Sequence, residues 1–450
     1  MRLEGILSSA ASGLDSVTRK LATVSQNVAN ANTPDYVRET VVSTSVTAAG
    51  DGYGVRSGPA IRTVDAALQA DLFTADGTVK DNEVRQSALA AVDAAQGAPG
   101  SGQDLASLFG ALRDGFSTLV NDPANQTQQR AVLNQASALA RGVNTLASSI
   151  SGTRQTVQDQ LVDDVGQANI ALSSVGRLSD QIIAARGRGE GTADLEDQRD
   201  TALRTVAELT GARFLTQSNG DITVVSSGTV LPTRAATGPL ALATATLSPG
   251  VAAPPLTVSG QAASLGGGRI GGELAVRDTV LPAAQADADG FAQALASGFQ
   301  AAGLTLFTNG AGVVPAAGTA GFAQLIRVSP TVAATPSQLR DGTGAAGTAG
   351  NTALIDTVLG TVFATGSGTI AGQAASLVAR NAQASATAGS TLSGNQAVQA
   401  SLSKKLAAGT GVSVDSELSL MVQLQNSYGA NARVIATVQT MWTQLLGTIQ

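Results

Sequence analysis

The feature that most constrains this chain is a heptad pattern of apolar residues at each of its two ends. Near the N-terminus, steps of four and three alternate through Leu3, Leu7, Ala10, Leu14, Val17, Leu21, Val24 and Val28. Near the C-terminus, the same steps run through Val414, Leu418, Met421, Gln425, Tyr428, Ala432, Ile435, Gln439, Trp442, Leu446 and Ile449. An amphipathic helix on its own cannot bury such an apolar face. We therefore predict that the two terminal helices pair as a coiled coil.

Residues at the inner edges of both patterns show where the helices stop and start. Asn30, Asn32 and Pro34 favour a turn, and proline cannot continue a helix. At the other end, Ser413 is a suitable N-cap, and Asp415 places negative charge in the first turn. On period alone, ordinary core helices explain the seams equally well. Their location at the chain ends, which usually fray, favours a role in assembly.

The first half of the region between the two seams is predicted to be helical. Residues Val79 to Leu209 are rich in Ala, Gln, Leu, Asp and Arg, with breaks at Gly97–Gly102 and Asn121–Pro123. From Ala212 the apolar period changes to two, and Asn219-Gly220 is a typical hairpin turn.

The second half alternates between helical and irregular segments. Helices are predicted over Glu273–Ala302 and Asn351–Ala408, with an irregular segment at 304–350. The predicted fold is mainly α with β insertions, built from a terminal coiled coil, a domain of long helices and a small outer β domain. The corresponding predicted domains are residues 1–45 with 405–450, 46–212 with 265–404, and 213–264, with a second irregular insertion at 304–350.

Composition excludes several classes of function. The chain has no histidine and no cysteine, which removes the commonest general base and metal ligand, thiolate nucleophiles and disulfides. A net charge of −6 and an aromatic content of 3% disfavour nucleic-acid binding. Charged residues make up 13% of the chain, which suits surfaces covered by partners. We expect no cofactor, no metal and no enzymatic activity.

The N-terminal residues do not resemble a secretory signal. Glu4, Ser8, Ser9 and Asp15 interrupt the stretch that would need to be apolar, and no run of eighteen apolar residues occurs in the chain. We therefore expect neither export by the general secretory route nor a membrane span.

Two motifs with possible chemistry also have plainer interpretations. Gly266–Gly271 matches a dinucleotide-binding fingerprint, but it lacks a convincing strand before it and parallel strands after it, so a tight turn is favoured. The acidic residues Asp194, Glu196, Asp197 and Asp200 could serve acid–base chemistry or a hard cation. A helix with acids in its first turn and exposed ion pairs to Arg199 and Arg204 is favoured.

Residues 12–38 resemble the signature shared by bacterial flagellar rod, hook and junction proteins. The resemblance rests on Ser12-Gly13-Leu14, Leu21 and the run SQNVANANTPDYVR at 25–38. That signature usually has glycine where this chain has Asp35, which tolerates left-handed backbone better than most residues. The stretches 411–418 and 425–435 are similar to the C-terminal end of the same family.

Central motifs narrow the resemblance to the junction between hook and filament. They are Asp194–Asp200, the Asn219-Gly220-Asp221 turn, and Gly271–Leu274 followed by Arg277–Pro282. This implies a structural subunit that is exported by the flagellar type III apparatus and lies outside the cell at that junction. The implied partners are copies of itself in a ring, the hook protein, the second junction protein and an export chaperone at the C-terminus, with no nucleic acid and no membrane.

The seams and the family signatures together suggest a set of assembly residues. They are Leu14, Leu21, Asn27, Asn30, Asn32, Thr33, Pro34, Tyr36, Leu418, Tyr428, Asn431, Arg433, Ile435 and Leu446. Two alternatives remain open. One is a hook or distal-rod subunit, which the shared terminal signatures allow, and the other is a carboxylate-dependent cell-wall hydrolase that would use Asp194–Asp200.

Overall fold

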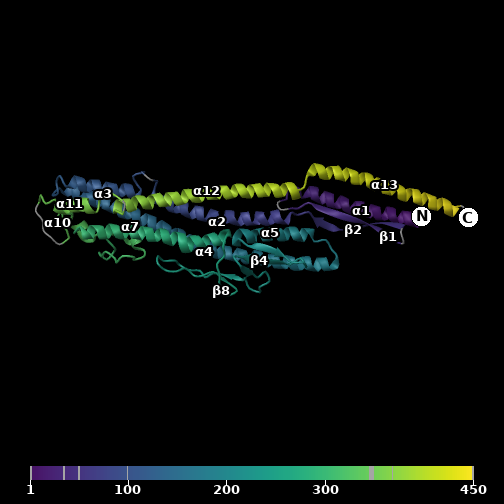
Figure 1. Ribbon diagram of the computed structural model, residues 1–450, viewed down its shortest axis with the longest axis horizontal. Helices are drawn as coiled ribbons and strands as arrows, with labels where there is room; N and C mark the ends of the chain where they lie inside the picture. Colours follow the sequence, from purple (N-terminus) through teal and green to yellow (C-terminus); the bar gives the residue numbers. More distant parts are fainter. Residues whose placement is uncertain are drawn as a thin grey trace. The chain divides into compact units, whose positions relative to one another are not determined.

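The computed structural model describes residues 3–33, 36–48, 51–98, 100–343, 349–366 and 368–447. The chain is mainly α-helical with small antiparallel sheets, as predicted (Figure 1). The helices are α1 Leu3–Ala29, α2 Ala66–Gln96, α3 Leu105–Leu119, α4 Gln126–Arg188, α5 Ala193–Thr210, α6 Gly268–Ala275, the π-helix η1 Val276–Val280, α7 Leu281–Ala301, α8 Phe322–Leu325, α9 Pro330–Ala334, α10 Gln338–Asp341, α11 Ala353–Thr361, α12 Ile370–Thr410 and α13 Val414–Gly447. The strands are β1 Glu39–Ala48, β2 Asp51–Arg62, β3 Arg213–Thr216, β4 Ile222–Ser226, β5 Thr229–Leu231, β6 Leu240–Ala241, β7 Thr257–Val258, β8 Gln261–Ala262, β9 Phe307–Thr308 and β10 Arg327–Val328.

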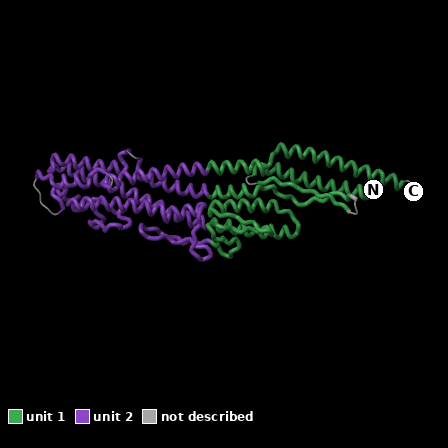
Figure 2. Tube along the Cα trace, in the orientation of Figure 1, with its two compact units in different colours: residues 1–77, 167–239, 396–450 green, residues 78–166, 240–395 purple. Residues whose placement is uncertain are grey.

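The chain divides into two compact units, shown in Figure 2. The first unit comprises residues 1–77, 167–239 and 396–450, and the second comprises 78–166 and 240–395. Strands β3–β5 form one sheet in the first unit, whereas β6–β8 form another in the second. The domain boundaries expected from the sequence, including a separate domain at 213–264, stay a prediction.

A large apolar core stabilises the second unit. Five phenylalanine side chains form its centre, with ring centroids 4.9 Å apart for Phe109 and Phe363 and 5.8 Å apart for Phe116 and Phe299. Phe307 completes this group, 5.4 Å from Phe299. Residues of the irregular segment 304–350 also lie in this core, so part of that segment is an internal element of the unit.

Most helix boundaries follow the local signals in the sequence. The predicted breaks separate α2 from α3 and α3 from α4. Asp104 caps α3 by accepting a bond from the Ser107 main-chain amide at 3.0 Å. The Asn219-Gly220 turn joins β3 to β4 in an antiparallel hairpin, and the φ of +91° at Gly220 explains the glycine there. The predicted helix breaks and the predicted hairpin turn are confirmed.

A long β-hairpin was missed by the sequence analysis. Strands β1 and β2 pair antiparallel, with Glu39 opposite Arg62, in a region for which no strand was predicted. The signal is the run from Thr40 to Thr47, in which six of the eight residues are β-branched Thr or Val and the other two are Ser.

Candidate assembly site at the chain ends

Helix α1 lies beside α13 in the first unit (Figure 1). Val17, Val24 and Leu424 are buried in this contact, and Leu21, Leu420 and Met421 pack around them. Burying each such side chain stabilises the pairing by roughly 1.5–3 kcal/mol. The chain ends therefore pack against each other through apolar seams.

The seam on α1 follows the predicted positions, but the seam on α13 departs from them. Leu14 and Leu21 are half-buried, between the buried residues Ala10, Val17 and Val24. On α13, Met421 and Ile435 are half-buried as expected. The predicted positions Leu418, Gln425, Ala432 and Gln439 are instead exposed, whereas the residues one position earlier, Glu417, Leu424, Asn431 and Val438, are buried or half-buried. Of the ten predicted α13 seam positions within the described residues, only Met421 and Ile435 are half-buried and the other eight are exposed, while Ile449 lies outside the described residues.

The opposite face of α1 packs against the β1–β2 hairpin. The hydroxyls of Ser16 and Ser43 are 2.8 Å apart, and Ser12 Oγ accepts a bond from the Val55 main-chain amide at 3.1 Å. Gly54 has a φ of +111°, and a Cβ atom at this position would overlap the Ser12 hydroxyl. Close approach of the hairpin therefore depends on small residues in both elements.

Asn27 is the polar centre of the N-terminal signature. It is 1% exposed, and its amide exchanges two hydrogen bonds with the main chain of Glu39, each 3.0 Å long. Asn27 Nδ2 also donates to Glu417 Oε2 at 3.2 Å, and Tyr36 donates its hydroxyl to Asn27 Oδ1 at 2.9 Å. One side chain therefore ties α1 to β1 and to the first turn of α13.

Glu417 was not selected from the sequence, although it completes this network. Its side chain is fully buried, and Arg38 Nε donates to Glu417 Oε1 at 2.5 Å. The main-chain amide of Arg38 donates to the Thr410 carbonyl at 3.0 Å. The apolar pattern gave no signal for it, because the predicted seam runs through Leu418 and leaves Glu417 one position off that line. A buried carboxylate on a helix seam requires hydrogen-bonded partners, and here the N-terminal signature supplies them.

The other predicted signature residues shape the turn after α1. Asn30 Nδ2 donates to the Gln26 carbonyl at 3.1 Å, and Asn30 Oδ1 accepts from Thr33 Oγ1 at 3.2 Å. Asn32 and Thr33 are exposed, and Pro34 lies outside the described residues. These observations agree with the capping and turn role that the sequence suggests for such residues.

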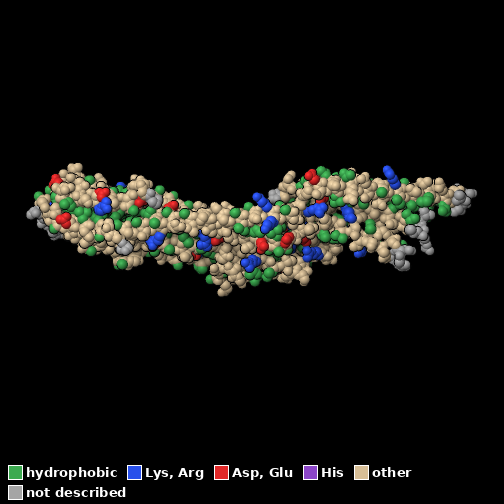
Figure 3. Space-filling model, turned by 45° about the horizontal axis from the view of Figure 1, so that its top comes forward, with side chains coloured by type: hydrophobic (Ala, Val, Ile, Leu, Met, Phe, Trp, Pro, Cys, Tyr) green, Lys and Arg blue, Asp and Glu red, His purple; other side chains and the backbone are tan. Residues whose placement is uncertain are grey.

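Helix α13 presents an open apolar surface on either side of its seam. Large apolar side chains are visible along it in Figure 3. We call this set the open apolar surface: Val414, Leu418, Val422, Tyr428, Val434, Met441, Trp442, Leu445 and Leu446, which are 40–58% exposed. Arg433 is also exposed, and Asn431 is half-buried with its side chain next to Gly13. Among the predicted assembly residues, Leu418, Tyr428 and Leu446 thus lie on this surface, while Ile435 lies on the seam.

The acids of α5 bind arginine in the folded chain. Arg62 of β2 lies 2.6 Å from Asp197 Oδ1 and 2.6 Å from Asp200 Oδ2, with Glu196 at 3.7 Å. Asp194 and Glu196 lie in the first turn of α5, as predicted. Arg199 donates to the Gly220 carbonyl at 2.8 Å, and Arg204 Nε lies 3.4 Å from Asp76 Oδ2.

The glycine-rich fingerprint at 266–271 forms a tight turn into α6. Gly267 and Gly268 have φ values of +98° and +65°. A Cβ atom on Gly272 would lie 2.8 Å from the Asp81 carbonyl, so this turn packs closely against α2. Close packing thus accounts for the glycines, as the sequence analysis favoured.

Two buried carboxyl groups meet below this turn. Glu273 is 1% exposed and hydrogen-bonds to Asp164 of α4, which lies 3.6 Å from Arg269 Nε. Burial, followed by the neighbouring Asp164, raises the pKa of Glu273 to about 9. At neutral pH Glu273 is therefore protonated and donates its hydrogen to Asp164.

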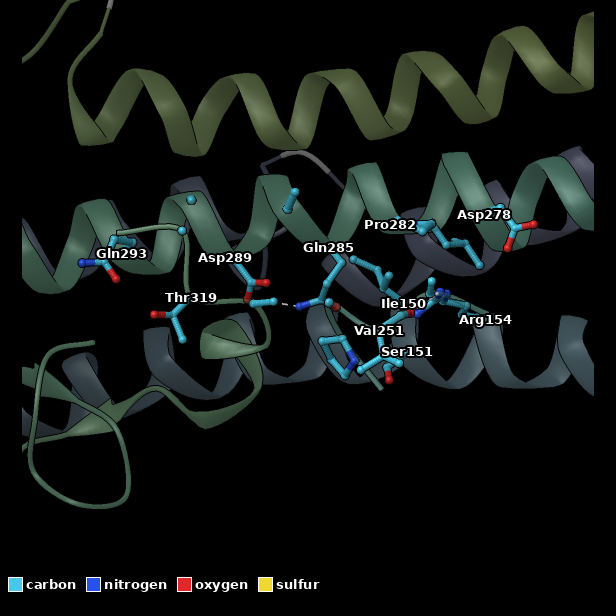
Figure 4. A pocket seen from close by; sticks show the side chains of 18 of the residues that line it. Ile150, Ser151, Arg154, Val251, Asp278, Pro282, Gln285, Asp289, Gln293 and Thr319 are labelled. Carbon is cyan, nitrogen blue, oxygen red and sulfur yellow. Dashed lines mark hydrogen bonds between the residues drawn. The ribbon is translucent and has the colours of Figure 1, made fainter. Parts of the chain in front are cut away.

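A cavity of about 620 Å³ lies in the second unit between α4 and α7 (Figure 4). Arg154 at its wall donates to three main-chain carbonyl oxygens at 3.0–3.2 Å. Asp289 accepts from the main-chain amides of Gly321 and Ala323, both at 2.8 Å. Both charged side chains are therefore engaged in hydrogen bonds to the main chain that hold neighbouring segments in place.

Neither a group of metal-binding side chains nor a membrane-crossing helix occurs among the described residues. Within these residues, no three or more carboxylates are grouped so that they could hold a metal ion. The helices in the same ranges lack the combination of length and apolar character that crossing a membrane requires.

Known protein families match both the helical middle and the C-terminal helix. The FlgK helical domain of the flagellar hook-associated proteins matches residues 92–312, and the C-terminal region of the flagellar basal body rod FlgEFG proteins matches residues 407–448. The helical middle of the chain therefore matches the flagellar hook-associated proteins, which form a structural and not an enzymatic family. The match to the helical domain favours this family over hook or distal-rod subunits.

Individual relatives agree with this family. The chain is 26% identical over 228 residues to flagellar hook-associated protein 1 of Salmonella typhimurium, covering 48% of this chain and 40% of the relative. It is 24% identical to the Escherichia coli protein of the same name, covering 48% and 41%. The aligned part of the chain thus spans about 40% of the length of these curated relatives. A solved structure of the flagellar hook junction protein FlgK from Burkholderia pseudomallei is 26% identical, with 54% of this chain and 45% of that chain aligned at a TM-score of 0.44.

Proposed function

We propose that this chain is a structural subunit of the bacterial flagellum that forms the junction between hook and filament by coupled folding and assembly of its terminal helices. The observation that carries the proposal is the open apolar surface of α13, whose side chains remain 40–58% exposed after α1 has packed on the seam. Apolar surface of this extent on a soluble helix marks a contact with other chains.

The proposed partners follow from the family. They are further copies of this chain in a ring, the hook protein, the second junction protein and an export chaperone that binds the C-terminal segment. The proposed location is the hook–filament junction outside the cell, reached through the flagellar type III apparatus. The terminal helices would form a coiled coil whose outer side is covered by neighbouring subunits.

Covering the open apolar surface gives a driving force for assembly. Each large side chain that a neighbour buries contributes roughly 1.5–3 kcal/mol, reduced by the part that is already covered in the single chain. Leu418 and Val422 lie one turn apart on one side of the seam and are 46% and 58% exposed. A charge at either position would remain solvated in the single chain but would be desolvated in the assembly.

The test is a pair of substitutions on α13. Leu418→Asp should leave the helical content and unfolding midpoint of the purified protein unchanged, but cells that express only this variant should not incorporate it into flagella. Ser419→Asp, on an exposed polar position of the same helix, should be incorporated normally. Normal flagella built from the Leu418→Asp protein would overturn the assembly role of this surface.

A deletion strain tests the location. Loss of this gene alone should leave hooks without filaments, with flagellin released to the medium. Cells without hooks would instead place the protein in the rod or hook, and unchanged flagella would refute a flagellar role.

A further inference from the structure

The acids of α5 and the β1–β2 hairpin meet in a partly buried cluster of charges in the first unit. Glu39 of β1 is 4% exposed, and its Oε1 atom has no hydrogen-bond partner within the described residues. The Arg62 side chain, 5% exposed, lies within 2.6 Å of Asp197 and Asp200. Gln26 of α1 adds a bond to Asp194 at 3.2 Å. We call Glu39, Arg62, Asp194, Glu196, Asp197 and Asp200 the hairpin cluster.

The cluster contains more carboxylates than nearby arginines can neutralise. The charged groups that act on Glu39 and Asp197 directly are Asp194 and Asp200 of α5 and Arg62 of β2. Around them, Glu196 pairs with Arg186 of α4, Glu417 of α13 pairs with Arg38, and Arg199 lies near Asp200 and Glu196, with the hydroxyl of Tyr36 beside these groups. With every group ionised, six carboxylates face four arginines, so two negative charges are in excess. Buried charges without partners are costly, and such groups gain a proton instead.

The geometry of the arginine decides which carboxyls are left over. Arg62 Nη2 donates to Asp200 Oδ2 at 2.6 Å, and Arg186 donates to Glu196 at 2.8 Å. Glu39 has no ion pair in the described structure. Asp197 Oδ1 lies 2.6 Å from Arg62 Nε but shares that arginine with two other acids, whereas Asp200 also accepts a bond from Gln69 at 2.8 Å. Glu39 and Asp197 are therefore the groups that hold a proton at the lowest cost.

We propose that the hairpin cluster is a proton-dependent clamp that holds the β1–β2 hairpin on α5, closed when Glu39 and Asp197 are protonated and loosened when both are ionised. The clamp gives the Asp194–Asp200 motif a role within the fold. It does not depend on the flagellar function proposed above.

The direction of the pH effect follows from the pKa values in the folded chain. Burial, followed by the charges of Asp194 and Asp197, raises the pKa of Glu39 to about 7. Burial also raises the pKa of Asp197 to about 6, against the opposing effect of Arg62. Both groups bind a proton more tightly in the folded chain than in the unfolded chain. Their contribution to stability is therefore complete below about pH 4 and is lost as the pH rises to about 7.

Hydrogen exchange on the full chain tests the clamp. Main-chain amides of β1 should be less protected at pH 8 than at pH 5.5, after correction for the intrinsic pH dependence of exchange. The pKa of Glu39 alone gives a loss of roughly 30-fold over this range. Amides of the β4–β5 hairpin should keep their protection. Glu39→Gln should remove most of the loss, because glutamine keeps the shape of the side chain and cannot ionise.

Two further variants keep the test decisive. Asp197→Asn should reduce the pH dependence by a smaller factor, and it serves as the second reporter should Glu39→Gln fail to fold. Asp15→Asn removes an exposed acid of α1 and should behave as the wild type. Equal protection of β1 in the wild type at both pH values would overturn the proposal. So would an undiminished pH dependence in either cluster variant.

Discussion

Replacing Leu424 by alanine, in comparison with Leu418, should show which of two possible lines of residues on α13 packs against α1. Leu424 is 7% exposed and packs with Val17 and Val24, whereas Leu418 on the register expected from the sequence is 46% exposed. Leucine-to-alanine changes in a core cost about 2–5 kcal/mol. The seam cluster is small and partly open to solvent, so we expect about 2–3 kcal/mol for Leu424→Ala. Leu418→Ala should cost less than about 0.5 kcal/mol.

Hydrogen exchange of α13 amides measures this difference locally. A loss of about 2–3 kcal/mol lowers the protection factors of these amides roughly 30- to 160-fold, because 1.36 kcal/mol corresponds to a factor of ten. Amides of α3 in the second unit serve as an internal reference and should not change. Equal effects of the two substitutions, or a larger effect of Leu418→Ala, would refute the packing of α1 on α13 described above.

Two further predictions concern buried polar residues, Asn27 in the first unit and Glu273 in the second. Asn27→Ala removes the bonds to the Glu39 main chain and to Glu417, so the first unit should lose about 2–4 kcal/mol of unfolding free energy in urea. The exposed Asn32→Ala should lose less than about 0.5 kcal/mol, and equal losses would contradict the central role of Asn27. Because the pKa of Glu273 is raised to about 9, the wild-type second unit should become less stable as the pH rises from about 5 to 9. Glu273→Gln should flatten this dependence of the melting temperature, Asp93→Asn on the same unit should retain it, and a Gln variant with the wild-type slope would contradict the assignment.

The α13 seam shows why apolar period alone could not fix the register of a helix. Leu418 and Val422 flank the seam on one side, and the buried line includes Leu424 and Val438 beside them. Where apolar residues cover more than one face, steps of four and three fit two neighbouring lines almost equally well. Packing against α1 decides which of the two registers is buried. The buried register also contains the polar residue Glu417, which made it harder to recognise from apolar residues alone.

Contacts between distant segments were the other part that the sequence could not supply. Breaks in the long helices, the Asn219-Gly220 turn and the start of α13 directly after Ser413 depend on neighbouring residues and were predicted correctly. The partners of Asp197 and Asp200 come from β2, far away in the chain, so no local rule could identify Arg62. The β1–β2 hairpin is different, because the Thr- and Val-rich run from Thr40 to Thr47 was a local signal for a strand and was overlooked.

The bond between Asn27 and Glu417 joins positions 390 residues apart. A ribosome completes the second unit, which ends at residue 395, before it reaches Glu417. Helix α1 is thus made first and obtains its native partner last. Closing a longer loop costs more entropy, and contacts between distant positions slow folding. The second unit is therefore expected to fold during synthesis, while the two chain ends find each other only after almost the whole chain has been made.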